Sequence, residues 1–199
     1  MCAIVGFICP NPTPEAIDTL KRLFWESKIR GMHAYGFAAT ENGETRTLKT
    51  LKLSELLNNI GSPQALIGHC RYSTSGDYTV MENNQPLEFE GEHMAFNGVI
   101  DMRTKPEMEQ AYGIKMNSDN DGEIMLQCPD RMALLKTKIS FAGLFLNGTM
   151  VSFIRNNNRP AYVAEKHGAV YIASTADILR RCLLRGEPLQ PLKVYSWTA

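Results

Sequence analysis

The chain has 199 residues, 44% of them hydrophobic, and its 21 basic residues balance 21 acidic ones. This length suits one sizeable domain, and zero net charge argues against a nucleic-acid or anionic-membrane partner. No apolar stretch reaches 18 residues, and the N-terminus lacks the features of a secretory signal. The five cysteines are irregularly spaced without a CxxC pair, so we expect a reduced, cytoplasmic protein with no metal or cofactor.

Apolar periodicity and turn residues predict alternating strands and helices along the chain. The expected strands cover residues 2–8, 37–40, 45–51, 65–72, 93–101, 138–146, 149–154, 160–165, 169–173 and 189–195. The expected helices cover residues 14–30, 53–60, part of 103–120, 121–128, 130–136 and 175–184, and a glycine-bounded loop covers 31–36. Asn42-Gly43 and Asn147-Gly148 indicate hairpins. The economical arrangement is one domain over residues 1–199, with two antiparallel sheets and helices outside them.

The first seven residues carry the most unusual chemistry. Cys2 follows Met1 and begins an apolar run. Cysteine is small enough for the initiator methionine to be removed, which would place a thiol and a free α-amine on one residue. An α-amine titrates near pH ~7.7–8.0, against ~10.4 for a lysine amine. Such a cysteine carries a near-neutral base beside its nucleophile, although a cysteine at the start of a core strand is the commoner situation.

Three further polar groups stand at the ends of predicted elements, where functional sites are usually built. They are Arg71, the pair Asn97-Gly98, and Asp121. Each has a structural alternative: Arg71 could form a salt bridge at a rim, Asn97-Gly98 a turn, and Asp121 a helix cap. Taken singly, the structural role is the more frequent one. The order of these residues along the chain, however, favours a functional role.

An ordered set of motifs runs through most of the sequence. It comprises Met-Cys-x-Ile-Val-Gly at 1–6, Arg30-Gly31 with Gly36, Gly68-His69-Cys70-Arg71-Tyr72-Ser73-Thr74, residues 83–86, Phe96-Asn97-Gly98-Val99-Ile100 and Asp121-Gly122-Glu123. This set resembles the class II glutamine amidotransferase domain of the N-terminal nucleophile hydrolases, and the resemblance extends to about residue 180. It implies an α+β fold, a four-layer αββα sandwich of two antiparallel sheets flanked by helices.

The resemblance also implies an activity and the residues that perform it. Cys2 would attack the side-chain amide of glutamine, form a γ-glutamyl thioester and release ammonia and glutamate. Asn97 and Gly98 match the oxyanion hole that a tetrahedral intermediate requires. The remaining matches are Arg71 for the substrate α-carboxylate, Asp121 for its α-ammonium group, Thr74, Ser75 and Gly76 for the loop lining the glutamine pocket, and Arg30 for ordering the N-terminal region.

Some positions depart from the family pattern. Phe96 replaces a frequent histidine, Tyr72 a tryptophan and Gly122 a threonine, and Asp119 stands two residues before Asp121. The chain also ends where a glutaminase domain should end, so we expect no synthase domain and a separate enzyme that accepts the ammonia. The alternatives are a stand-alone hydrolase of another γ-glutamyl or amide substrate, and a catalytically silent assembly or regulatory module.

Overall fold

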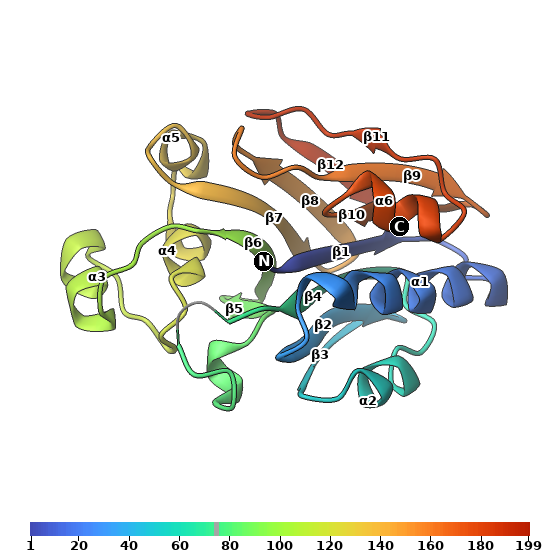
Figure 1. Ribbon diagram of the computed structural model, residues 1–199, viewed down its shortest axis with the longest axis horizontal. Helices are drawn as coiled ribbons and strands as arrows, with labels where there is room; N and C mark the ends of the chain where they lie inside the picture. The colour runs from blue at the N-terminus through green and yellow to red at the C-terminus, as the bar shows by residue number, and fades with distance from the viewer. Residues whose placement is uncertain (74–75) are drawn as a thin grey trace.

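The computed structural model describes residues 1–73 and 76–199, which form two antiparallel sheets packed between two layers of helices (Figure 1). The first sheet has the strand order β11 (Glu187–Pro188), β9 (Tyr162–Lys166), β10 (Ala169–Ala173), β1 (Ala3–Ile8), β4 (Ala65–Arg71), β2 (Ala34–Glu41) and β3 (Glu44–Thr50). The second has the order β12 (Tyr195–Thr198), β8 (Met150–Arg155), β7 (Ser140–Asn147), β6 (Glu92–Val99) and β5 (Leu87–Phe89). The predicted αββα fold class is confirmed.

Three apolar clusters hold the layers together. One, which includes Ile4, Ile67 and Leu144, lies between the sheets. A second packs the first sheet against α1 (Pro14–Ser27), α2 (Leu53–Asn58) and α6 (Ala176–Arg181). A third packs the second sheet against α3 (Lys105–Tyr112), α4 (Gly122–Gln127) and α5 (Arg131–Leu135). Successive side chains of a strand point to opposite faces, so a strand covered on both faces, such as β1, reads as a continuous apolar run.

The sheet register brings the chain's polar positions to one edge. β1 pairs with β4 so that Ala3 lies opposite Cys70, which places Cys2 beside the end of β4 at Arg71. β6 ends at Val99 in the facing sheet, and the N-terminus lies close to it in Figure 1. The candidate residues therefore meet where β1 begins and β4 and β6 end.

Local chemistry explains most of the element boundaries. Thr13 caps α1 by accepting from the Ala16 N–H, and the 3-10 turn η1 (Lys28–Arg30) completes the expected helix to residue 30. Asn42 and Gly43 join β2 to β3 with positive φ angles of 53° and 84°, as a two-residue hairpin turn requires. A second 3-10 turn, η2 (Met81–Asn83), precedes β5.

Two boundary predictions are wrong. β2 begins at Ala34, inside the expected loop 31–36, because residues 34–36 pair with the end of β4. The final strand does not cover residues 189–195. There the chain turns at Leu192, whose φ is +55°, and only from Tyr195 does it pair with β8. The helices in the described parts of the chain are short, and none has the length and apolar character needed to cross a membrane.

Candidate active site

Two adjoining hollows lie at the edge where β1 begins and β4 and β6 end. The first is lined by Cys2, Arg71, Tyr72, Gln85, Phe96, Gly98, Asn120 and Asp121. The second is lined by Met1, Cys2, Tyr72, Asn97, Gly98, Val99 and Arg159. Cys2, Tyr72 and Gly98 belong to both. The structure thus brings together the predicted nucleophile, the predicted oxyanion pair and the two residues predicted to bind the substrate head group.

Cys2 is half-buried at the entrance to β1. Its Sγ lies 3.5 Å from the carbonyl oxygen of Tyr72 and donates to it, and its own carbonyl accepts from Arg30 Nε at 3.0 Å. Burial raises the pKa of the Cys2 thiol, while the positive charges of the N-terminus, Arg71 and Arg30 oppose that shift. The thiol is therefore neutral at pH 7, and a base must remove its proton before it can act as a nucleophile.

Asn97 and Gly98 lie within β6 and do not form the turn that the pair usually indicates. The side-chain nitrogen of Asn97 is buried without a hydrogen-bond partner among the described residues. A buried donor left unpaired costs about 1–3 kcal/mol, so it calls for an acceptor. A Cβ atom at Gly98 would lie 1.9 Å from the carbonyl oxygen of Ser140, so only glycine allows β7 to approach here.

Arg71 ends β4 and is almost fully buried, at 4% exposure. Its Nη1 donates to the Asn83 carbonyl and to Asn84 Oδ1, both at 2.6 Å, and its Nη2 donates to the Gly76 carbonyl at 3.3 Å. Burial lowers the pKa of the guanidinium, and the carboxylates of Asp121 and Asp77 oppose that shift. Arg71 therefore joins the cavity to the segment between Gly76 and Asn84.

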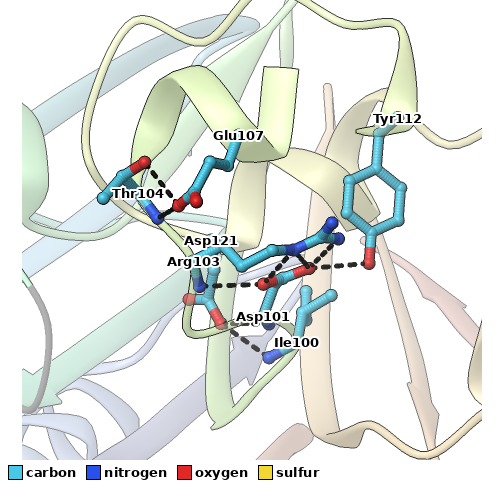
Figure 2. Close-up of polar contacts among 7 residues, drawn as sticks. All are labelled: Ile100, Asp101, Arg103, Thr104, Glu107, Tyr112 and Asp121. Carbon is cyan, nitrogen blue, oxygen red and sulfur yellow. Dashed lines mark hydrogen bonds and ion pairs between the residues drawn. The ribbon is translucent and has the colours of Figure 1, made fainter. Parts of the chain in front are cut away.

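Asp121 precedes α4 but does not cap it, because its carboxylate is used elsewhere. Its Oδ2 accepts from the backbone N–H groups of Ile100 at 2.6 Å and Asp101 at 3.1 Å, as Figure 2 shows. Its Oδ1 has no hydrogen-bond partner in the described parts of the chain. Burial raises the pKa of Asp121, and the two backbone donors oppose that shift. Asp119, the other candidate, is exposed, so Asp121 is the carboxylate that lines the cavity.

The segment that follows β6 is tied down beside Asp121. Arg103 donates to both carboxylate oxygens of Asp101, and Tyr112 donates to one of them at 3.1 Å (Figure 2). These bonds hold the pKa of Asp101 well below its usual range. Thr104 and Glu107 form a capping box that starts α3. Asp121 thus accepts from backbone groups that are themselves fixed.

The predicted pocket loop is described only in part. Thr74 and Ser75 lie outside the described residues. Gly76 has φ +64°, and its carbonyl accepts from Arg71 and from Ser73 Oγ. The His33 ring is stacked between the rings of Tyr72 and Tyr78, each with a centroid distance of 4.8 Å. The aromatic stack connects the two sides of this loop beside the cavity.

Several residues in or beside the two hollows were not predicted from the sequence as site residues. Asn84 and Gln85 come from the polar run 83–86, and Gln85 Oε1 accepts from the Phe96 N–H at 2.6 Å. Asn120 Nδ2 donates to the Asn83 carbonyl at 2.9 Å. The polar composition of these two segments was the sequence signal that could have identified these residues. No sequence signal marked Arg159, because it lies in a turn between β8 and β9 and only the folded arrangement of the strands brings it to the site.

Comparisons with known proteins show what the chain is similar to. No protein-family model matches the sequence. The chain is 27% identical over 199 residues to a glutamine–fructose-6-phosphate aminotransferase of Halalkalibacterium halodurans, covering 88% of this chain and 32% of that protein. It is 29% identical over 140 residues to an amidophosphoribosyltransferase of Methanothermobacter thermautotrophicus, covering 62% of this chain and 28% of that protein. The chain thus spans about a third of the length of these relatives.

Solved structures share the fold. Glutamine phosphoribosylpyrophosphate amidotransferase of B. subtilis matches with a TM-score of 0.76 at 18% identity, over 99% of this chain and 49% of that one. A glutamine aminotransferase class-II domain protein of Silicibacter pomeroyi matches with a TM-score of 0.65 at 11% identity, over 100% of this chain and 95% of that one. The predicted resemblance to class II glutamine amidotransferase domains is confirmed.

Proposed function

We propose that this chain hydrolyses the side-chain amide of glutamine and supplies the ammonia to an acceptor enzyme. The observation that carries the proposal is the buried, unpartnered side-chain nitrogen of Asn97, which shares a hollow with Cys2 and Gly98. A donor held in advance where negative charge will develop is the main requirement for attack on an amide. The similarity to amidotransferases in sequence and in fold supports the choice of glutamine.

The reaction begins once Met1 has been removed. The α-amine of Cys2 takes the thiol proton, and Sγ forms a bond to the amide carbon of glutamine. The carbonyl oxygen becomes an oxyanion that accepts from Asn97 Nδ2 and the Gly98 N–H. The α-ammonium returns the proton to the leaving nitrogen, the carbon–nitrogen bond breaks, and ammonia departs from a γ-glutamyl thioester. Water, deprotonated by the same amine, then attacks the thioester, which releases glutamate and restores the thiol.

The zwitterionic head group of glutamine fits the two charged side chains of the cavity. Asp121 Oδ1 is available for the α-ammonium, because only Oδ2 is used by the backbone. Arg71 is positioned for the α-carboxylate, and its 3.3 Å bond to the Gly76 carbonyl is the longest of the three described above. A carboxylate would replace that bond with a charge-assisted one, which is roughly twice as strong.

The ammonia is passed on to another enzyme in this proposal. The relatives are named as a glutamine–fructose-6-phosphate aminotransferase and an amidophosphoribosyltransferase, and both are much longer than this chain. We infer an acceptor synthase or synthetase for the present chain, with residues 1–199 forming the single glutaminase domain.

The test compares glutamine with N-acetylglutamine, using protein whose loss of Met1 has been verified by mass spectrometry. We expect glutamate release from glutamine, little from N-acetylglutamine, and none from Cys2→Ala. Cys128→Ala serves as the matched control, because Cys128 is the other half-buried cysteine, and it should retain activity. Equal rates on the two substrates would contradict the charge clamp and favour a hydrolase of other amides. Full activity of Cys2→Ala would refute the nucleophile.

A further inference from the structure

Two arginines from distant parts of the chain converge on its first residue. Arg30 Nη2 lies 3.7 Å from the Met1 sulfur, and Arg159 Nη1 lies 3.5 Å from the same atom. A thioether sulfur is only a weak hydrogen-bond acceptor, and it neutralises neither charge. Two guanidinium groups therefore sit side by side at the residue that precedes Cys2.

Arg159 is fixed in this position by the strand that faces the nucleophile. Its Nε donates to Ser140 Oγ at 2.6 Å, and Ser140 begins β7 opposite Val99. Its Nη1 contacts the Met1 sulfur, and Met1, Cys2 and Arg159 line the same hollow. Arg30 is fixed from the opposite side, by its bond to the Cys2 carbonyl.

The balance of charge around Cys2 is positive. Arg30 comes from η1, Arg71 from β4, and Arg159 from the turn between β8 and β9, while Asp121 is the carboxylate among the described residues that line the two hollows. Neither Arg30 nor Arg159 forms an ion pair with a carboxylate of the described residues. Burial raises the pKa of the Cys70 thiol in β4, so this neighbouring group is neutral at pH 7. Arg159 and burial both lower the pKa of Arg30.

We propose that Arg159 acts with Arg30 to keep the α-amine of mature Cys2 unprotonated at neutral pH, through the electrostatic repulsion of their guanidinium groups. The inference rests on the proposed function, in which that amine is the base. A like charge in the same hollow disfavours protonation, and loss of one such charge at a partly solvated site shifts a pKa by roughly 0.5–1 unit. Arg159 is thus a positioning residue that acts on the base and does not touch the substrate.

The experiment follows the protonation of the amine directly by ¹³C NMR of protein carrying ¹³C-labelled cysteine. The Cα signal of Cys2 is assigned by its absence from Cys2→Ala and is titrated with pH, without substrate. Arg159→Gln should raise the apparent pKa of the amine by roughly 0.5–1 unit, whereas Arg159→Lys, which keeps the charge, should leave it near the wild-type value. Arg180→Gln removes an exposed arginine of α6 and should change nothing.

Kinetics and salt supply two further readouts. The acidic limb of kcat/KM for glutamine should move to higher pH in Arg159→Gln by the same amount as the NMR titration. High salt should raise the wild-type amine pKa, because it screens the guanidinium charges, and this measurement needs no variant. An unchanged titration in Arg159→Gln, or an equal shift in Arg159→Lys, would overturn the proposal. Failure of the proposed function would instead appear as absent glutamine hydrolysis in the wild type, whatever the titration shows.

Discussion

Phe96 and Gly122 form a contact that can be broken and restored by mutation. A Cβ atom at position 122 would lie 2.3 Å from Cε1 of Phe96 and 2.8 Å from Cδ1 of Leu87. The Phe96 ring cannot retreat, because it is stacked on Phe141 with a centroid distance of 5.3 Å. Gly122→Ala should therefore destabilise the protein by about 1–3 kcal/mol, the usual cost of overpacking a core. Asn97 follows Phe96 directly, so turnover should fall as well.

A double-mutant cycle measures whether this clash is the cause. Phe96→Leu removes part of the ring and should cost about 1–2 kcal/mol on its own through lost packing. In that background Gly122→Ala should cost at least 1 kcal/mol less than in the wild type, since the nearest of the atoms that the new Cβ meets is gone. Urea unfolding followed by circular dichroism supplies the four free energies. Additive effects of the two substitutions would refute the contact as the reason for glycine at 122.

Three further outcomes follow from the site and its surroundings. Asn97→Ala should lower kcat for glutamine by about 10²–10³-fold with little change in KM, and an effect on KM alone would make Asn97 a ground-state contact. Arg71→Lys and Asp121→Asn should each raise KM more than they lower kcat, because they weaken capture of the head group, and unchanged KM values would contradict that assignment. Burial lowers the pKa of His69 to about 3, so the unfolded state binds an extra proton below pH 6.5, and stability should fall by about 2 kcal/mol between pH 6.5 and 5. His69→Gln should remove that part of the pH dependence, as measured by urea unfolding at each pH.

The sequence predicted most of the elements because their signals are local. The strand over 65–72 and the helix over 14–30 follow from apolar spacing, a capping threonine and flanking prolines. The hairpin at Asn42-Gly43 follows from the positive φ angles that its turn requires. The strand expected over 189–195 failed because apolar residues alone do not show whether a neighbouring strand is available to pair.

In the candidate site, too, residues in short sequence motifs could be predicted, whereas contacts that depend on the tertiary fold could not. Cys2 and Asn97 stand in short motifs, and their meeting depends only on the fold that those motifs indicate. Arg159 reaches the site because Ser140 anchors it across a turn, and Asn84 accepts from Arg71 because η2 presents it there. Both contacts depend on the exact path of a loop, which residue spacing does not encode.

The departures from the family pattern have a physical explanation in the packing. Phe96 and Gly122 fit together, because the phenyl ring occupies the space that a side chain at position 122 would need. Tyr72 offers its backbone carbonyl to the Cys2 thiol, a contact that any residue could make, and uses its ring to stack on His33. Phe96 and Tyr72 line the hollow that also holds Cys2, Arg71 and Asp121. The substitutions therefore reshape the walls of the cavity while the groups that would perform the chemistry stay in place.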